Sequence, residues 1–232
     1  MTQAISTPND KITIAVLGGT GAEGSGLALR WAQAGHRVIL GSRNPEKAAT
    51  RTTELNALLG RDAIVWKNNM DAAVAAQVVV LTVPHTAQHA TVEEVRSALA
   101  GKILIDATVP LVPPKVNRVQ LPPSGSAVAA IQKLLGDEVR VVSAFQNVSA
   151  HHLKNLDHRV DCDVLVCSDD IAARALVIDL AKDLGLRGVH AGPICNSAAA
   201  EALTSILISI NMAYKVPGAG LRITGVPALE RS

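Results

Sequence analysis

The sequence is poor in aromatic residues, which make up 2% of its 232 residues. Proteins that bind single-stranded nucleic acids commonly stack bases on aromatic side chains, and this chain offers few of them. Its formal net charge is only +2, so it also lacks the large basic excess of a nucleic-acid-binding surface. We therefore expect no nucleic-acid partner. Because 48% of the residues are hydrophobic and few are aromatic, we expect a core packed from Ala, Val, Leu and Ile.

Cysteine is scarce as well. Cys162, Cys167 and Cys195 show no CxxC spacing, which favours free, buried thiols in a reducing compartment. Residues 1–10 are polar and lack the basic and apolar leader of a secreted protein. No apolar run reaches the roughly 20 residues that span a bilayer. The sequence therefore predicts a cytoplasmic protein without a membrane partner.

Strand-like and helix-like segments alternate through the first 145 residues. β-branched and apolar runs predict strands within 11–19, 37–42, 63–68, 76–84, 102–110 and 138–145. Helical spacing predicts helices over 25–36, 46–60 and 86–101, with Gly35 and Gly60 as C-terminal stops and Pro45 in a first turn. This alternation predicts an α/β fold with a doubly wound parallel sheet of the Rossmann type.

The pattern changes after Phe145. Residues 111–126 contain four prolines, which exclude a regular element and predict a loop or flap at the ligand edge of the sheet. A smaller unit is expected from strands within 163–170 and 187–193, helices over 171–185 and 198–214, and a short strand at Leu221 to Thr224. We therefore predict a dinucleotide-binding domain over 11–145 and a small substrate or dimerisation domain over 146–232.

A glycine-rich turn follows the first predicted strand. In "VLGGTGAEGSG" the spacing Gly19-x-Gly21-x-x-Gly24 lies between a strand and a helix. Glycines there make a tight turn, let the backbone approach a pyrophosphate and let the helix pack on the strand, while the helix N-terminus attracts the anion. The motif predicts dinucleotide binding by its residues Gly19, Thr20, Gly21, Ala22, Glu23 and Gly24; the alternative is a turn that only packs.

The end of the second strand predicts which dinucleotide is bound. Dinucleotide-binding proteins read the adenosine ribose about 20 residues past the glycine motif, and an acid there suits NAD. Here "GSRNPEK" provides Ser42, Arg43 and Lys47 instead. A planar guanidinium matches a phosphate, and Lys47 follows one helical turn later. We interpret this segment as a 2′-phosphate reader for NADP(H); the alternative is a solvated basic patch.

Other polar residues have competing interpretations. "VPH" ends the fourth strand, so Val83, Pro84 and His85 are expected to line the cofactor site. His85 and His89 have the spacing of a metal pair, but no nearby acid completes a set, and no metal site is predicted. "SDD" at 168–170 precedes a helix and is interpreted as capping residues. No Ser-His-Asp or Cys-His signature is present, so no protein nucleophile is predicted.

Several segments together resemble one family, the NADPH-dependent reductases of the deazaflavin coenzyme F420, or F420:NADP oxidoreductases. They span about Lys11 to Asn211: "AVLGGTGAEGSGLALR", "GSRNPEKA", "VVVLTVP", "VVSAF", "DVLVCSDD" and "AGPICNSAAAEALTSILISIN". The resemblance implies that Thr20, Ser42, Arg43 and Lys47 hold NADP(H), and that the deazaflavin lies over the nicotinamide between a large and a small domain. It also implies a homodimer. Two positions depart from the family pattern, His85 in place of Trp and Gln146 in place of a nearby histidine.

The chemistry that the resemblance implies asks little of the protein. Hydride passes directly from nicotinamide C4 to deazaflavin C5, so the protein holds two rings about 3–3.5 Å apart and excludes water. Small residues near Val109 are expected to let the rings stack, and Gln146 and Asn147 to hydrogen-bond them or else to serve the fold. An NADPH-dependent reductase of an imine, ketone, flavin or quinone, and a non-catalytic NADPH sensor, remain as alternatives.

Overall fold

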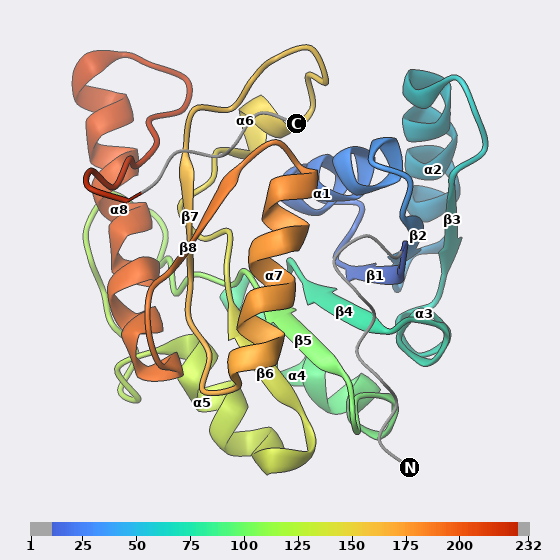
Figure 1. The fold of residues 1–232 in the computed structure, drawn as a ribbon, viewed down its shortest axis with the longest axis horizontal. Helices are drawn as coiled ribbons and strands as arrows, with labels where there is room; N and C mark the ends of the chain where they lie inside the picture. Colours follow the sequence, from blue (N-terminus) through green and yellow to red (C-terminus); the bar gives the residue numbers. More distant parts are fainter. Residues whose placement is uncertain (1–10, 227–232) are drawn as a thin grey trace.

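The computed structural model describes residues 11–226, and its main element is a six-stranded sheet (Figure 1). All neighbouring strands are parallel, in the order β3-β2-β1-β4-β5-β6. The strands are β1 (Thr13–Leu17), β2 (Arg37–Gly41), β3 (Ile64–Lys67), β4 (Val78–Leu81), β5 (Ile103–Asp106) and β6 (Arg140–Ser143). This order is that of the doubly wound dinucleotide-binding folds, and the predicted fold class is confirmed.

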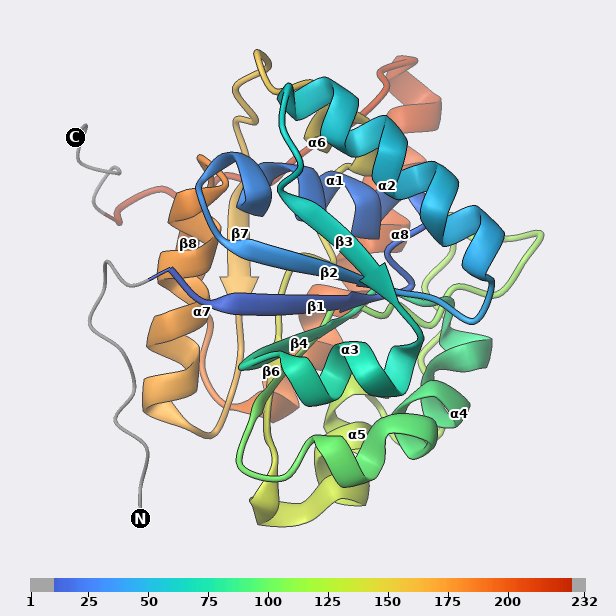
Figure 2. The same ribbon diagram turned by 90° about the vertical axis from the view of Figure 1, so that its right-hand side faces the viewer.

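Helices cover both faces of this sheet (Figure 2). One hydrophobic cluster joins the sheet to α1 (Ala22–Gln33), α2 (Pro45–Leu59) and α7 (Ile171–Asp183). A second cluster joins the opposite face to α3 (Asn69–Ala75), α4 (His85–Val95) and α5 (Ala127–Leu135). Short 3-10 turns follow two of these helices, η1 (Arg96–Ala98) and η2 (Gly136–Glu138). The core therefore consists of two aliphatic layers around the sheet.

Sequence patterns did not predict α3 or α5. The seven residues of α3 are too few for a clear helical period. In contrast, α5 carried a usable signal, because Ser126 caps its first turn and its apolar residues Val128, Ile131 and Leu135 recur at helical spacing. The proline-rich stretch before it, 111–126, contains no helix or strand, as predicted.

A smaller sheet lies beside the main one. It pairs β7 (Asp163–Val166) with β8 (Arg187–His190) in parallel, and a single antiparallel bridge from Ser143 to Cys167 connects it to β6. The chain also forms α6 (Ala150–Leu153), η3 (Ile194–Asn196) and the long α8 (Ser197–Tyr214). Residues of β7 and α7 share one hydrophobic cluster with β1 and α1, so the division into domains at residue 145 stays a prediction.

The first helix of the nucleotide fold packs against α6 and α7. Trp31 on α1 is fully buried, donates its indole N–H to the Leu180 carbonyl at 3.0 Å, and meets the Phe145 ring edge-on at 5.7 Å. The neighbouring Arg30 is also buried, and its guanidinium donates to backbone carbonyls of Leu153, Leu184, His152, Asn155 and His158. Burial lowers the pKa of Arg30 from its ordinary value.

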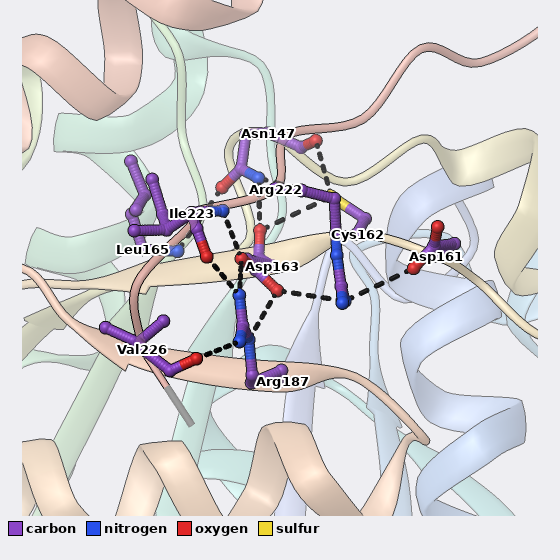
Figure 3. Close-up of polar contacts among 9 residues, drawn as sticks. All are labelled: Asn147, Asp161, Cys162, Asp163, Leu165, Arg187, Arg222, Ile223 and Val226. Atoms are coloured by element: carbon purple, nitrogen blue, oxygen red, sulfur yellow. Dashed lines mark hydrogen bonds and ion pairs between the residues drawn. The ribbon is translucent and has the colours of Figure 1, made fainter. Parts of the chain in front are cut away.

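The predicted strand at Leu221 to Thr224 is wrong, because residues 221–226 run along β7 without forming a ladder. The Leu221 carbonyl accepts from the Asp163 N–H at 2.7 Å, but the next contact is to the Asp163 carboxylate, which accepts from the Ile223 N–H at 2.6 Å. Arg187 pairs with this carboxylate and donates to the Ile223 carbonyl (Figure 3). A buried side-chain ion pair therefore holds this segment in place of main-chain pairing.

Two expectations from composition need correction. Cys162 and Cys167 are buried free thiols as predicted, but Cys195 in η3 is exposed. Among the described residues, the segment Ile194–Tyr214 is long and apolar enough to cross a membrane by length and composition, contrary to the expectation that no such run exists. Only 33% of that window is buried, and core helices of soluble proteins also meet the criterion.

Candidate cofactor site

The glycine-rich turn joins β1 to α1 in a space that excludes side chains. The tight turn is made by Gly18, with φ +81°, where a Cβ atom would lie 2.9 Å from the Thr82 carbonyl oxygen. A Cβ on Gly19 would lie 2.8 Å from the Val16 carbonyl, and one on Gly24 would collide with Thr82. A Cβ on Gly21 meets only the Gly18 carbonyl, at 3.2 Å. The glycines thus bring α1 close to β4 and leave the backbone of the turn open.

The helices that follow β1 and β4 begin without a side-chain cap. Gly21 precedes α1 and Pro84 precedes α4, and neither supplies a capping acceptor. In contrast, Asn44, Asn68, Ser126 and Asp170 cap α2, α3, α5 and α7, which confirms the capping role predicted for the "SDD" segment. β1 and β4 are neighbours where the strand order reverses, which is where ligands bind in such sheets. The free N–H groups therefore face the expected crevice for an anion.

The predicted 2′-phosphate reader lies at the end of β2. The buried Ser42 exchanges hydrogen bonds with the main chain of Asn44, whose side chain accepts from the Lys47 N–H at 2.9 Å. Arg43 and Lys47 are exposed, and neither pairs with a carboxylate within residues 11–226. Two cationic side chains therefore stand on a fixed turn with no internal partner.

Beyond β4, the edge of the sheet is lined by a buried carboxyl that the sequence did not predict. Asp106, which ends β5, is 0% exposed, accepts from the Gln88 amide at 2.6 Å and from the Thr108 N–H at 2.9 Å. Burial raises its pKa, and these hydrogen bonds and the nearby His85 oppose that rise. Of the predicted lining residues, Val83, His85 and Val109 are half-buried and Pro84 is exposed.

Gln146 belongs to the same edge. It follows Phe145, whose φ of +77° is rare for a bulky residue and turns the chain sharply at the end of β6. The Gln146 amide donates to the Asp106 carbonyl at 2.8 Å and to the Ser143 hydroxyl at 2.9 Å. Its Oε1 is buried without a partner in the described chain. An unsatisfied polar atom of Gln146 thus lies at this edge, which fits a ligand there.

Asn147, predicted with Gln146, contacts β7 and the residue before it (Figure 3). Its amide donates to the Asp163 carbonyl at 2.6 Å and to the Cys162 sulfur at 3.3 Å, and its Oδ1 accepts from the Leu165 N–H. These contacts tie β6 to β7 and use both ends of the amide. The structure therefore favours the alternative in which Asn147 serves the fold.

The helix α8 and the proline-rich loop border this edge. Thr204 donates to the Gln146 carbonyl at 2.7 Å, and Ser209 donates to the Asn117 carbonyl at 3.0 Å. Glu201 is fully buried and accepts from Ser126 and from the N–H groups of Ala127 and Val128, at the start of α5. Burial raises the pKa of Glu201. A long-range side-chain network therefore closes the edge, and sequence spacing gave no sign of it.

No metal centre emerges from the described residues. Within 11–226, no group of three or more His, Cys, Asp or Glu side chains is arranged to hold an ion. His85 and His89 have no third ligand there. The site presents glycines, helix N-termini, cations and amides, which suit a dinucleotide.

Comparisons with known proteins agree with this chemistry. Residues 13–110 match the family described as NADP oxidoreductase coenzyme F420-dependent. The F420-dependent NADP reductase of Methanocaldococcus jannaschii is 42% identical over 221 residues, which cover 92% of this chain and 98% of that protein. The enzyme of the same name from Methanothermobacter thermautotrophicus is 41% identical over 94% of this chain and 97% of its own. The chain belongs to the F420-dependent NADP reductase family.

A solved structure supports the same assignment. A candidate F420-dependent NADP reductase from Arthrobacter sp. FB24 superposes with a TM-score of 0.78 at 28% identity. The match covers 92% of this chain and 99% of that one. The family therefore extends across both sheets, including the small C-terminal unit that residues 13–110 do not reach.

Proposed function

We propose that this chain is an F420-dependent NADP reductase that transfers a hydride between NADP(H) and coenzyme F420. The observation that carries the proposal is the uncapped start of α1 at the β1–β4 switch point, with Arg43 and Lys47 at the end of β2. Relatives of that name match over nearly the whole chain. The structural features support the nucleotide half of the reaction, and the relatives support the deazaflavin half.

In this proposal, main-chain groups and cations hold NADP(H). The turn from Gly19 to Gly24 receives the pyrophosphate against the N-terminus of α1. Ser42, Arg43 and Lys47 bind the 2′-phosphate, Arg43 through its planar fork and Lys47 as a point charge. The nicotinamide half then crosses β4 toward β5, beside Val83, Pro84 and His85.

The deazaflavin side is formed by β5, β6 and α8. When bound together, the two cofactors supply a direct hydride transfer between nicotinamide C4 and deazaflavin C5. The chain positions the rings and excludes water. Val109 and the small residues around it give flat rings room, and the free Gln146 Oε1 is a polar atom left to orient them. No nucleophile of the protein takes part.

We further propose a cytoplasmic homodimer that covers α8. Ile206, Met212 and Tyr214 on this helix are 47%, 64% and 76% exposed, although the same helix buries Glu201 against α5. Sedimentation at micromolar concentration tests the dimer, and a monomer with full activity would contradict it.

Turnover with NADPH and purified F420, followed by loss of deazaflavin absorbance, tests the reaction. We expect saturable turnover with F420 and much poorer turnover with flavin mononucleotide. Tight NADPH binding without F420 reduction across a range of pH would overturn the proposal. That result would favour a reductase of another small substrate or a non-catalytic NADPH sensor.

A further inference from the structure

A cavity of about 200 Å³ lies between α6 and the segment that follows α8. Ser149 and His152 line it on the side of α6, and residues 218–220 line it on the other side. The chain that leads to β7, from His158 to Cys162, completes the lining. None of the residues proposed to hold NADP(H) or the deazaflavin lines this cavity, so it is a separate place on the molecule.

The walls of the cavity are held by contacts that span long stretches of sequence. The Arg30 guanidinium of α1 donates to the carbonyls of His152 and His158 at 3.1 and 2.8 Å. The two imidazole rings stack at 4.5 Å, and His152 Nε2 donates to the Gly218 carbonyl at 3.0 Å. A Cβ atom on Gly218 would lie 2.5 Å from the Ser149 Oγ. The fold therefore sets the shape of this cavity, and position 218 needs glycine.

Three side chains in the lining carry hydrogen-bond donors that the described chain leaves unused. The Ser149 hydroxyl, the His158 ring and the Arg159 guanidinium have no hydrogen-bond or ion-pair partner within residues 11–226. A guanidinium carries five N–H donors in a planar fork and no acceptor. The cavity is therefore rich in donors, which suits a ligand with several acceptor atoms.

The unpaired charge of the lining is positive. Asp161 is the carboxylate among the lining residues, and Arg222 pairs with it at 3.2 Å and with Asp163 at 3.3 Å (Figure 3). Burial raises the pKa of the Cys162 thiol, so this group stays neutral and does not repel an anion. Arg159 is then the charge that the lining offers to a ligand, and it attracts an anion.

We propose that this cavity binds a small phosphate, either the free ion or a monoester of a small molecule. Arg159 holds two phosphate oxygens through its planar fork, and the His158 ring and the Ser149 hydroxyl donate to the others. Pockets for drug-sized ligands measure about 300–1,000 Å³, so this cavity is too small for a dinucleotide. The inference does not depend on the proposed function.

Nuclear magnetic resonance tests the site by titration of the ¹⁵N-labelled chain with inorganic phosphate at constant ionic strength. We expect the main-chain amide signals of Ser149, Gly218 and Gly220 to shift along one saturable curve. Phosphate that occupies the proposed 2′-phosphate reader shifts the amides of Ser42 and Arg43 instead, so the spectra separate the two places. A second titration uses glycerol phosphate. Tighter binding than inorganic phosphate assigns the monoester, and equal or weaker binding assigns the free ion.

Two substitutions of exposed cations distinguish a site from general attraction of anions. Arg159→Gln should weaken phosphate binding at these amides by about tenfold or more, because a charge-assisted hydrogen bond is lost. Lys154→Gln removes the same charge from a neighbouring residue that does not line the cavity, and it should leave the curve unchanged. Ser149→Ala, which removes one neutral donor, should give a smaller weakening than Arg159→Gln.

The outcomes that overturn the proposal are specific to this cavity. They are the absence of a saturable shift at Ser149, Gly218 and Gly220, an unchanged curve in Arg159→Gln, or equal weakening in Arg159→Gln and Lys154→Gln. Should Arg159→Gln not fold, the Ser149→Ala curve decides, and no weakening there contradicts the proposal. Turnover with F420 is measured separately, so a failure of this site leaves the proposed function standing.

Discussion

The two halves of the site are built from different kinds of contact. On the β1–β2 side, glycines shape the main chain and exposed cations await a ligand, with few side-chain contacts inside the protein. On the β5–β6 side, the buried Asp106, Gln146 and Glu201 each form hydrogen bonds with residues far away in the sequence. The comparison teaches that the proposed nucleotide side is encoded locally, whereas the proposed deazaflavin side depends on tertiary assembly.

Arg30 gives the largest expected effect on that assembly. Arg30→Leu would leave the five carbonyls around its guanidinium without their buried donor. We expect a loss of about 3–5 kcal/mol in the free energy of unfolding, at the upper end for one substitution. Urea unfolding of the variant and of the original chain measures this loss. The exposed Arg37→Leu should stay within about 0.5 kcal/mol of the original chain, and an equally small effect for Arg30→Leu would break the comparison.

Arg43 tests the β1–β2 side of the site, which short sequence patterns encode. Arg43→Ala should weaken NADPH by on the order of ten- to a hundredfold, because a charge-assisted hydrogen bond contributes roughly 1.5–3 kcal/mol. NADH lacks the 2′-phosphate, so its weak binding should hardly change. Dissociation constants for both cofactors provide the measurement, and Arg51→Ala on α2, the helix that follows this turn, is a matched control. Equal losses for NADPH and NADH would mean that Arg43 stacks on adenine or supports the fold.

Glu201 tests the side of the site that depends on tertiary contacts. Glu201→Ala removes the acceptor for the N–H groups of Ala127 and Val128 and for Ser126. We expect destabilisation of about 1–3 kcal/mol and a smaller loss for Glu201→Gln, which retains one acceptor oxygen. Thermal unfolding compares these variants with the exposed Glu138→Ala. Unchanged stability in Glu201→Ala would show that the closure of α8 over α5 does not depend on this carboxyl.

Gln146 gives the smallest expected effect. Gln146→Ala removes the free Oε1 beside Asp106 and should impair F420 use by about 0.5–1.5 kcal/mol, a few-fold in kcat/KM for F420. NADPH affinity should be nearly unchanged. Asn147→Ala should instead lower stability, since its amide connects β6 to β7. Equal losses of F420 and NADPH affinity in Gln146→Ala would indicate that this residue also serves the nucleotide side of the site.

The sequence allowed much of the fold to be predicted where the signal was local. Strands, α1 and the glycine turn follow from short patterns, because a Cβ at Gly18 or Gly24 has no room whatever the rest of the chain does. Short elements escaped prediction. α3 is seven residues long, and the segment at 221–226 is held by the Asp163 carboxylate and Arg187, not by a ladder.

The candidate site divides in the same way. Arg43 and Lys47 were predicted from their spacing after the glycine motif, and the structure finds both exposed with no carboxylate partner among the described residues. Asp106, Gln88 and Glu201 were not predicted, because the side chains with which they form hydrogen bonds lie 18 or more residues away. Asn147 was predicted to hydrogen-bond a cofactor or else to serve the fold, and its amide is used at β7. No pattern of single residues reveals such distant pairs.

Isotope transfer tests the central claim most directly. NADPH carrying deuterium at the transferable C4 position is incubated with F420 and the protein, and the reduced deazaflavin is analysed by mass spectrometry. Direct hydride transfer in a water-excluding site predicts that the deuterium is retained on the deazaflavin, with none gained when unlabelled NADPH reacts in deuterated water at the same carbon. Reduced deazaflavin that takes this hydrogen from solvent, or no reduction at all, would contradict the account.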